Sequence, residues 1–172
     1  MLKKLLFLPD IAFLLVAFNA ATTTWKLDTA HSYLGFSVGH LSVSEIKGSV
    51  VMTEATITTT SEDFSDATVS MKADMNTIDT DNEKRDAHLK TADFFDTAKY
   101  PELTFQSTSF KKTGADKYVI KGNLTMHGIT KEVTLDATTK SGTNPNNNKP
   151  ITGMKITGSI NRLDFDISKS AP

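Results

Sequence analysis

The sequence predicts an all-β protein whose strands are mainly antiparallel and curl into a barrel. From Trp25 onward, threonine, valine and isoleucine are frequent, and apolar residues repeatedly alternate with polar ones. Each such strand has one apolar and one polar face, which is typical of antiparallel sheets because parallel sheets are covered on both faces. We expect about eight strands, and a single antiparallel sheet of that size tends to curl or close. A barrel is therefore the first expectation and a two-sheet sandwich the second.

The alternation places the strands along the chain, and turn-forming residues separate them. Three connectors, KKTGADK (111–117), HGITK (127–131) and SGTNPNNNKP (141–150), have hairpin length and are rich in turn residues. The apolar positions that keep one face of each strand are Leu34, Phe36 and Val38; Val69, Met71, Ala73 and Met75; Leu103 and Phe105; Tyr118, Ile120, Leu124 and Met126; Val133 and Leu135; and Met154, Ile156 and Ile160.

The start of the chain has the order of a secretory signal. Two lysines come first, the apolar run Ile11–Phe18 follows, and two alanines come shortly after it, although a proline and an aspartate precede the apolar run. The run is far shorter than the roughly 20 apolar residues that a membrane-spanning helix needs. We therefore expect residues 1–21 to be a signal peptide and residues 22–172 to form one barrel domain in the periplasm or outside the cell.

Composition excludes several classes of function. The chain has 172 residues, with 19 basic and 20 acidic side chains, so it lacks the basic excess of a nucleic-acid-binding protein. It has no cysteine, which excludes disulfides, thiolate zinc sites and cysteine nucleophiles. The fold must therefore be held by packing and hydrogen bonding alone.

One stretch, DTDNEKRDAHLKTADFFD at residues 79–96, departs from the strand pattern and predicts a short helical crossover. Asp81 or Asn82 is suited to cap the helix, and Arg85 and His88 lie on the same side of it. These side chains could form an acid–base cluster. The favoured interpretation is a capped helix whose ion pairs fix it to the rim of the barrel.

The residues expected to face the interior include small and flexible ones. They indicate a pocket that could hold one small apolar ligand, because an eight-stranded barrel is just wide enough for that. Glycines at such positions also mark bulges or bends, and methionine is also ordinary core filler. The small residues are Ala73, Gly122, Ala137 and Gly158, and the methionines are Met71, Met75, Met126 and Met154.

The four histidines, His31, His40, His88 and His127, do not form a recognisable metal or catalytic motif. If the chain is extended around Asp28 and His31, their odd spacing places them on opposite faces. The sequence also has no nucleophile elbow and no phosphate-binding loop. We therefore assign no catalytic residue and no metal ligand, and expect each histidine to be structural.

Several motifs nevertheless occur in a specific order, and with them the chain resembles the YceI-like family of bacterial polyisoprenoid-binding proteins. The motifs are Trp25-x-x-Asp28-x-x-His31-Ser32, Arg85-Asp86-x-His88-Leu89, Asp93-Phe94-Phe95, Tyr100-Pro101, Leu124-Thr125-x-His127-Gly128 and Asn161-Arg162-x-Asp164-Phe165. The resemblance runs from Trp25 to about Phe165. It implies a lipocalin-like barrel that encloses the tail of an apolar lipid. It also implies that the protein sometimes associates transiently with the membrane or with quinone-linked membrane proteins.

The resemblance also gives roles to residues. Phe94 and Phe95 are expected to turn toward the apolar interior, and the motif residues are expected to brace the crossover and the strand ends. The expected lining is Leu34, Phe36, Val38, Val69, Met71, Ala73, Met75, Phe94, Phe95, Phe105, Ile120, Leu124, Met126, Leu135, Met154, Ile156 and Ile160. The bracing residues are Trp25, Asp28, His31, Arg85, Asp86, His88, His127, Asn161, Arg162 and Asp164. Family members usually continue into a further closing strand, whereas this sequence ends at DISKSAP, so an open barrel edge is expected.

The leading hypothesis is a periplasmic or secreted carrier, monomeric or homodimeric, that holds one polyisoprenoid, isoprenoid quinone or fatty-chain amphiphile and needs no other cofactor. A second hypothesis is a lipid-modifying or metal-assisted enzyme that uses His31, His88 and Asp28 at the barrel mouth. A third is a stress-induced structural protein of the bacterial envelope.

Overall fold

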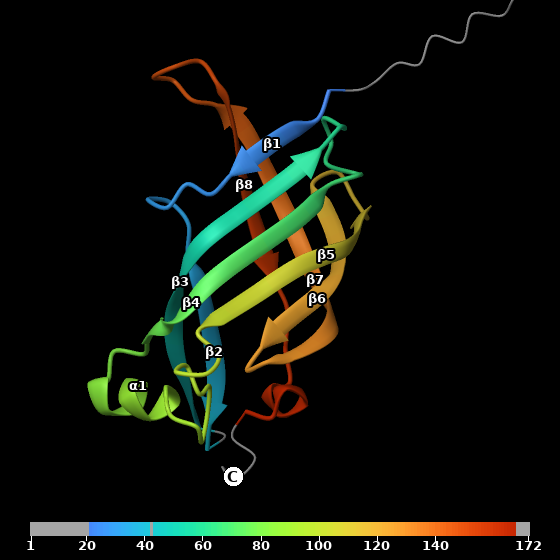
Figure 1. Ribbon diagram of the computed structural model, residues 1–172. Helices are drawn as coiled ribbons and strands as arrows, with labels where there is room; N and C mark the ends of the chain where they lie inside the picture. The colour runs from blue at the N-terminus through green and yellow to red at the C-terminus, as the bar shows by residue number, and fades with distance from the viewer. Residues whose placement is uncertain (1–20, 42, 168–172) are drawn as a thin grey trace, which may run out of the picture.

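The computed structural model describes residues 21–41 and 43–167, which form one strongly curled antiparallel sheet with a short helix at one end (Figure 1). The predicted all-β, antiparallel fold is confirmed. The expected signal peptide lies outside the described residues, apart from Ala21. The strands are β1 (Thr23–Lys26), β2 (Leu34–His40), β3 (Ser44–Thr59), β4 (Thr68–Asp79), β5 (Glu102–Lys112), β6 (Lys117–Met126), β7 (Ile129–Thr143) and β8 (Pro150–Thr157); the helices are α1 (Glu83–Leu89) and the 3₁₀ helix η1 (Arg162–Phe165).

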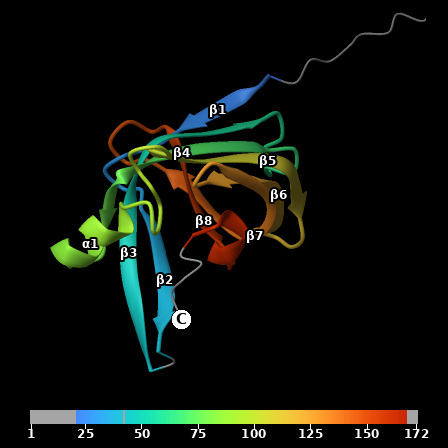
Figure 2. The same cartoon turned by 60° about the horizontal axis from the view of Figure 1, so that its bottom comes forward.

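Strand β3 organises one side of the sheet because it pairs with three other strands. Its first half pairs with β2, its last four residues pair with β1, and β4 runs along its other edge. From β4 the sheet continues in chain order to β8. Within the described residues no strand pairing joins β8 to β1 or β2, so the sheet is a half-barrel with free edges around a concave face (Figure 2).

Interruptions in the ladders change which side chains face inward. The β3–β4 register shifts between Ser49 and Val51, and the β5–β6 register shifts between Ser107 and Ser109. A bulge inserts an extra residue and so reverses the alternation beyond it. The bulge in β5 puts Phe110 on the buried side at 8% exposure, and the extra residues that β4 has between Asp74 and Asp79 put Ile78 there at 2%. Neither residue is among the predicted lining.

Two apolar clusters fill the concave side. The larger lies under β4 to β7 and includes Phe105, Ile120 and Phe165, and the smaller joins Val50 to Met75 beside β2 and α1. Met71, Phe95 and Leu103 pack against both clusters, so the two form one continuous apolar layer. Neither described helix is long and apolar enough to cross a bilayer.

The small inward residues do not leave the room that the sequence indicated. A Cβ built on Gly122 would lie 2.4 Å from the Phe105 Cζ atom, and one built on Gly158 would lie 2.3 Å from the Leu135 Cδ2 atom. Large neighbours therefore occupy the space that these glycines open. Ala73 and Ala137 are likewise enclosed, at 0% and 2% exposure. The glycines allow close packing of the layer rather than a cavity in it.

Helix α1 is anchored to the end of β4 through Thr80, which is only 4% exposed. Asn82 caps the helix by accepting a hydrogen bond from the Arg85 backbone N–H at 3.0 Å. The Arg85 guanidinium donates to both the hydroxyl and the carbonyl oxygen of Thr80, while the Asp86 carboxylate accepts from the hydroxyl and the backbone N–H. The predicted capped helix is confirmed, but hydrogen bonds to Thr80 fix it in place.

The loop between β3 and β4 closes one end of the larger cluster and is held by two aspartates. The Asp66 carboxylate accepts hydrogen bonds from the Thr59 and Thr60 hydroxyls, which lower the pKa of Asp66 from 3.8 to about 2. The Lys112 ammonium lies 2.8 Å from the Asp63 carboxylate and holds the pKa of that carboxyl well below its usual range. The loop carries Phe64, which is buried against the core.

The tight contact at Gly122 gives a stability prediction. Gly122→Ala forces a methyl group against the Phe105 ring and the Gln106 carbonyl oxygen and should lower the free energy of unfolding by about 1–3 kcal/mol. Gly142→Ala in β7, where a Cβ meets nothing within 4 Å, is the matched control and should stay within about 0.5 kcal/mol of wild type. Urea denaturation measures both, and equal stability of the two variants would contradict the packing described.

The Asp66 contacts predict how stability depends on pH. Because the folded pKa lies below the unfolded value, the stabilisation is present above about pH 4 and is lost as the pH falls toward about 2. Asp66→Asn should therefore be less stable than wild type at neutral pH and should lose less stability between these pH values. Asp136→Asn, on an exposed position of β7, controls for the removal of one charge. Thermal unfolding at several pH values tests this, and parallel curves for wild type and Asp66→Asn would refute it.

Candidate functional site

The candidate site lies where the concave apolar layer reaches the free edges of the sheet. Residues directly opposite each other in paired strands share a face. Leu34 pairs with buried Val50, and Ile156 pairs with Ala137, which is 2% exposed, so the corresponding faces of β2 and β8 look toward the concave side. We define the apolar seam as the side chains on these edges: Leu34, Phe36 and Val38 from β2, Met154 and Ile156 from β8, and Ile160 beyond it.

Exposure distinguishes three residues of the seam from the rest of the predicted lining. Val38, Ile156 and Ile160 are 39%, 37% and 37% exposed. The sequence predicted that they would line an enclosed interior, and this prediction is wrong for these three side chains. Ile160 was also expected in a strand, but β8 ends at Thr157 because the chain turns toward η1. The other predicted lining residues are buried or half-buried in the two clusters: Leu34, Phe36, Val69, Met71, Ala73, Met75, Phe94, Phe95, Phe105, Ile120, Leu124, Met126, Leu135 and Met154.

Helix η1 covers part of the concave face and was not expected there. Phe165 and Ile167 are 1% and 2% exposed and belong to the larger cluster. The carbonyl oxygen of Phe165 lies 3.0 Å from the His127 Nδ1 atom, and the His127 ring packs edge-on against Tyr100 at 4.9 Å. His127 therefore links the β6–β7 turn to η1. The motif spacing gave no signal for this contact because the two segments are distant in the sequence.

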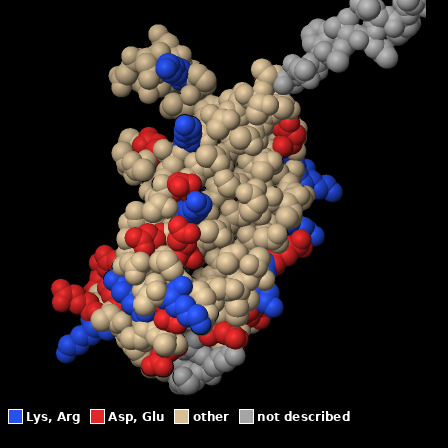
Figure 3. Space-filling view, in the orientation of Figure 1, with Lys and Arg blue, Asp and Glu red and all other residues tan. Residues whose placement is uncertain are grey.

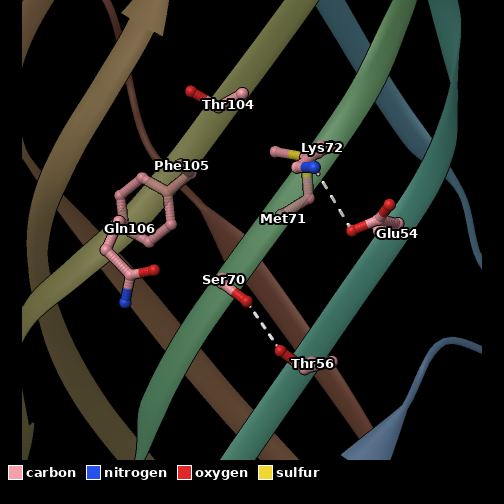
Figure 4. Close-up of a pocket in the computed structure, with 8 residues that line it drawn as sticks. All are labelled: Glu54, Thr56, Ser70, Met71, Lys72, Thr104, Phe105 and Gln106. Carbon is pink, nitrogen blue, oxygen red and sulfur yellow. Dashed lines mark hydrogen bonds and ion pairs between the residues drawn. The ribbon is translucent and has the colours of Figure 1, made fainter.

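Two hollows on the surface lie away from the seam. The first, of about 330 Å³, has polar lining residues that include Glu54 and Lys72, with the Lys72 ammonium 3.5 Å from the Glu54 carboxylate, and two apolar ones, Met71 and Phe105 (Figure 4). Thr56 and Ser70 hydrogen-bond across it at 2.6 Å. The second, of about 310 Å³, is lined by polar residues that include Asp74 and Asn76. Three residues of the predicted lining border these hollows, Met71 and Phe105 the first and Ala73 the second, but both hollows also carry charged side chains and lie outside the seam.

His31, His88 and His127 lie in separate places, and the contact of His31 corrects the sequence-based expectation. The His31 Nδ1 atom lies 2.9 Å from the Asp28 carboxylate, because residues 28–31 form a turn and not the extended segment assumed. This hydrogen bond lowers the pKa of Asp28. His88 lies 3.7 Å from the Asp93 carboxylate and packs edge-on against Phe94. Among the described residues, no group of three or more His, Cys, Asp or Glu side chains is arranged to hold a metal ion.

The remaining motif residues shape the ends of the sheet. Trp25 packs against Phe64 with ring centroids 5.8 Å apart, and its buried indole N–H has no hydrogen-bond partner. The Asn161 side chain caps η1 by accepting from the Leu163 backbone N–H at 3.1 Å and lies 3.3 Å from the Asp164 carboxylate. Arg162 is half-buried, and its carbonyl oxygen accepts from Ile167. The arrangement offers apolar contact along the seam and no catalytic constellation within the described residues.

Comparisons with known proteins agree with this fold. A family model described as a YceI-like domain matches residues 25–171. Proteins named YceI from Salmonella newport and Escherichia coli O157:H7 are each 36% identical, over 98% and 97% of this chain and 88% of their own length. The crystal structure of a YceI protein from Campylobacter jejuni is similar with a TM-score of 0.67 at 29% identity, over 86% of each chain. BcnA from Burkholderia cenocepacia shares the fold, with a TM-score of 0.67 at 23% identity over 81% of this chain and 84% of its own.

Proposed function

The chain belongs to the YceI-like family, and from this premise we propose that it binds one extended apolar lipid along the apolar seam. The ligand is a polyisoprenoid, an isoprenoid quinone or a fatty-chain amphiphile, as the family resemblance implies. The chain of the lipid lies between the β2 and β8 edges, on top of the apolar layer. Its polar end remains near solvent.

The exposure of Val38, Ile156 and Ile160 is the observation that carries this proposal. Val38 and Ile156 share the concave face with residues buried in the core, and Ile160 follows β8 in the chain, so a bound lipid chain would extend the apolar layer outward. Each methylene removed from water contributes about 0.8 kcal/mol before ordering costs. A chain of about ten carbons could therefore bind without any hydrogen bond to the protein.

We also propose that the protein acts as a carrier in the bacterial envelope, in the periplasm or outside the cell, as a monomer or a homodimer. The signal-like order of the first residues supports this location. A lipid released into water needs its chain covered, and the seam offers such cover. A quinone-linked membrane protein is a fitting delivery partner if the ligand is a quinone.

Binding explains the site better than catalysis does. Asp28 with His31 and His88 with Asp93 form two separate exposed pairs, each completed by its own partner. A hydrolytic zinc centre typically takes three protein ligands. The pairs instead fix a turn and the end of the crossover, which are structural tasks.

Affinity should depend on the length of the lipid chain. In a series of isoprenoid alcohols, each added isoprene unit should strengthen binding until the seam is covered, because each unit adds apolar contact. Titration with the fluorescence of Trp25, the sole tryptophan, measures the dissociation constants. Affinities independent of chain length would contradict the proposed binding mode.

Strand β8 provides a matched pair of variants for the same assay. Ile156 faces the concave side, whereas Ile151 lies at an odd offset from it on the other face and is 48% exposed. Ile156→Asn should weaken binding of the longest alcohol about tenfold, which corresponds to about 1.4 kcal/mol. Ile151→Asn should bind like wild type. Equal affinity of both variants would place the ligand elsewhere.

A further inference from the structure

The tip of the β2–β3 hairpin presents two large apolar side chains to solvent. Leu41 and Val43 are 73% and 84% exposed, among the highest values for large apolar residues of the described chain. The hairpin projects past α1 and η1, and its tip lies at the far end of the molecule in both ribbon views (Figure 2). Leu41 is also held at a φ of 51°, a left-handed conformation that is uncommon for a bulky residue. The two side chains are thus presented together on a narrow protrusion.

The hairpin tip, residues 40–44, also contains no Asp, Glu, Lys or Arg, and the nearest such side chain along β3 is that of Glu45. Residues 29–44 contain no Asp, Glu, Lys or Arg, which makes these 16 residues the longest such stretch of the sequence. On the face of the molecule in Figure 3, by contrast, basic and acidic side chains intermingle around α1. Moving a charged side chain into an apolar environment is costly, whereas small, aliphatic and hydroxyl-bearing side chains carry a much smaller cost.

From these observations we infer that the β2–β3 tip docks on the surface of a lipid bilayer, with Leu41 and Val43 inserted among the acyl chains. The docking is apolar, because the tip carries no lysine or arginine to attract anionic headgroups. Zwitterionic lipid is therefore sufficient, and salt has little effect on the affinity.

A second copy of the chain fits the tip less well than a bilayer does. A stable protein interface buries about 800 Å² on each partner and needs a broad complementary surface. Two side chains at the end of a two-stranded protrusion offer only a small convex contact. A fluid bilayer needs no matching shape, so a narrow apolar protrusion suits it.

The tip is continuous with the apolar seam, so docking on a bilayer would bring the seam close to membrane lipids. Val38 and Phe36 lie on one face of β2 between the tip and the smaller buried cluster, and Ile46 pairs with Val38 from β3. An acyl or isoprenoid chain leaving the bilayer at the tip would therefore meet apolar side chains along its path. This use rests on the proposed lipid-binding function, whereas the docking itself does not.

Flotation with vesicles of pure phosphatidylcholine tests the docking. Wild-type protein should float with the vesicles at both low and high salt. The double variant Leu41→Asp, Val43→Asp should lose at least about tenfold in vesicle affinity, since two charges would enter the hydrocarbon. Val51→Asp is the matched control, because Val51 is also an exposed valine of the same hairpin, at 58%, but lies on the convex face away from the tip. This control should float like wild type.

The docking is refuted if wild-type protein stays with the buffer, if Val51→Asp loses as much affinity as the double variant, or if flotation requires anionic lipid and disappears in high salt. It is also refuted if light scattering shows a dimer that the double variant converts to a monomer, because the tip is then covered by a second copy.

Binding of a soluble isoprenoid alcohol without vesicles separates the two proposals. The double variant should retain it, and its absence in wild-type protein that still floats would refute the lipid-binding function alone.

Discussion

The pairing of β3 with three strands is the constraint on which the rest of the structure depends. With 16 residues, β3 is longer than β1 and β2 together, and these two strands pair with different segments of the same edge of β3. The register shift between Met52 and Glu54 places an extra residue, Thr53, in β3 between the segments that pair with these two partners, and such a bulge bends a strand. As a result the sheet curls around a concave face, β2 extends away from the body as a hairpin with β3, and β2 and β8 remain free at the edges of the half-barrel. The seam and the hairpin tip both follow from this arrangement.

Close packing of the apolar layer decides where a ligand can bind. The rings of Phe105 and Phe165 and the side chain of Leu135 fill the concave side where small residues had indicated room. The apolar surface still open to a ligand therefore lies at the sheet edges, where side chains such as Val38 and Ile156 have neighbours on one side only. An apolar chain bound there gains contact without displacing the core.

Regular alternation predicted much of the fold, and local irregularity limited the rest. Strand β6 keeps its period over its whole length, β4 keeps it from Val69 to Met75, and the cap at Asn82 is a local signal, so all three were identified. Strand β3 was missed as a unit because the extra residue Thr53 breaks its period, and Phe110 was missed because the bulge between Ser107 and Ser109 reverses its face. Asp28 and His31 meet because a turn replaces the extended chain assumed there. The contact of His127 with Phe165 depends on tertiary packing, which no local pattern encodes.

The most direct measurement of the central claim is nuclear Overhauser contact between a bound isoprenoid alcohol and protein labelled at its isoleucine, leucine and valine methyl groups. The methyl groups of Val38, Ile156 and Ile160 should show contacts to the lipid chain. Those of Val51 and Ile151, which are more exposed, at 58% and 48%, but lie on the convex side, should show none. Contacts confined to the convex methyl groups, or a bound lipid with no contact to the seam, would contradict the assignment of the seam as the lipid-binding surface.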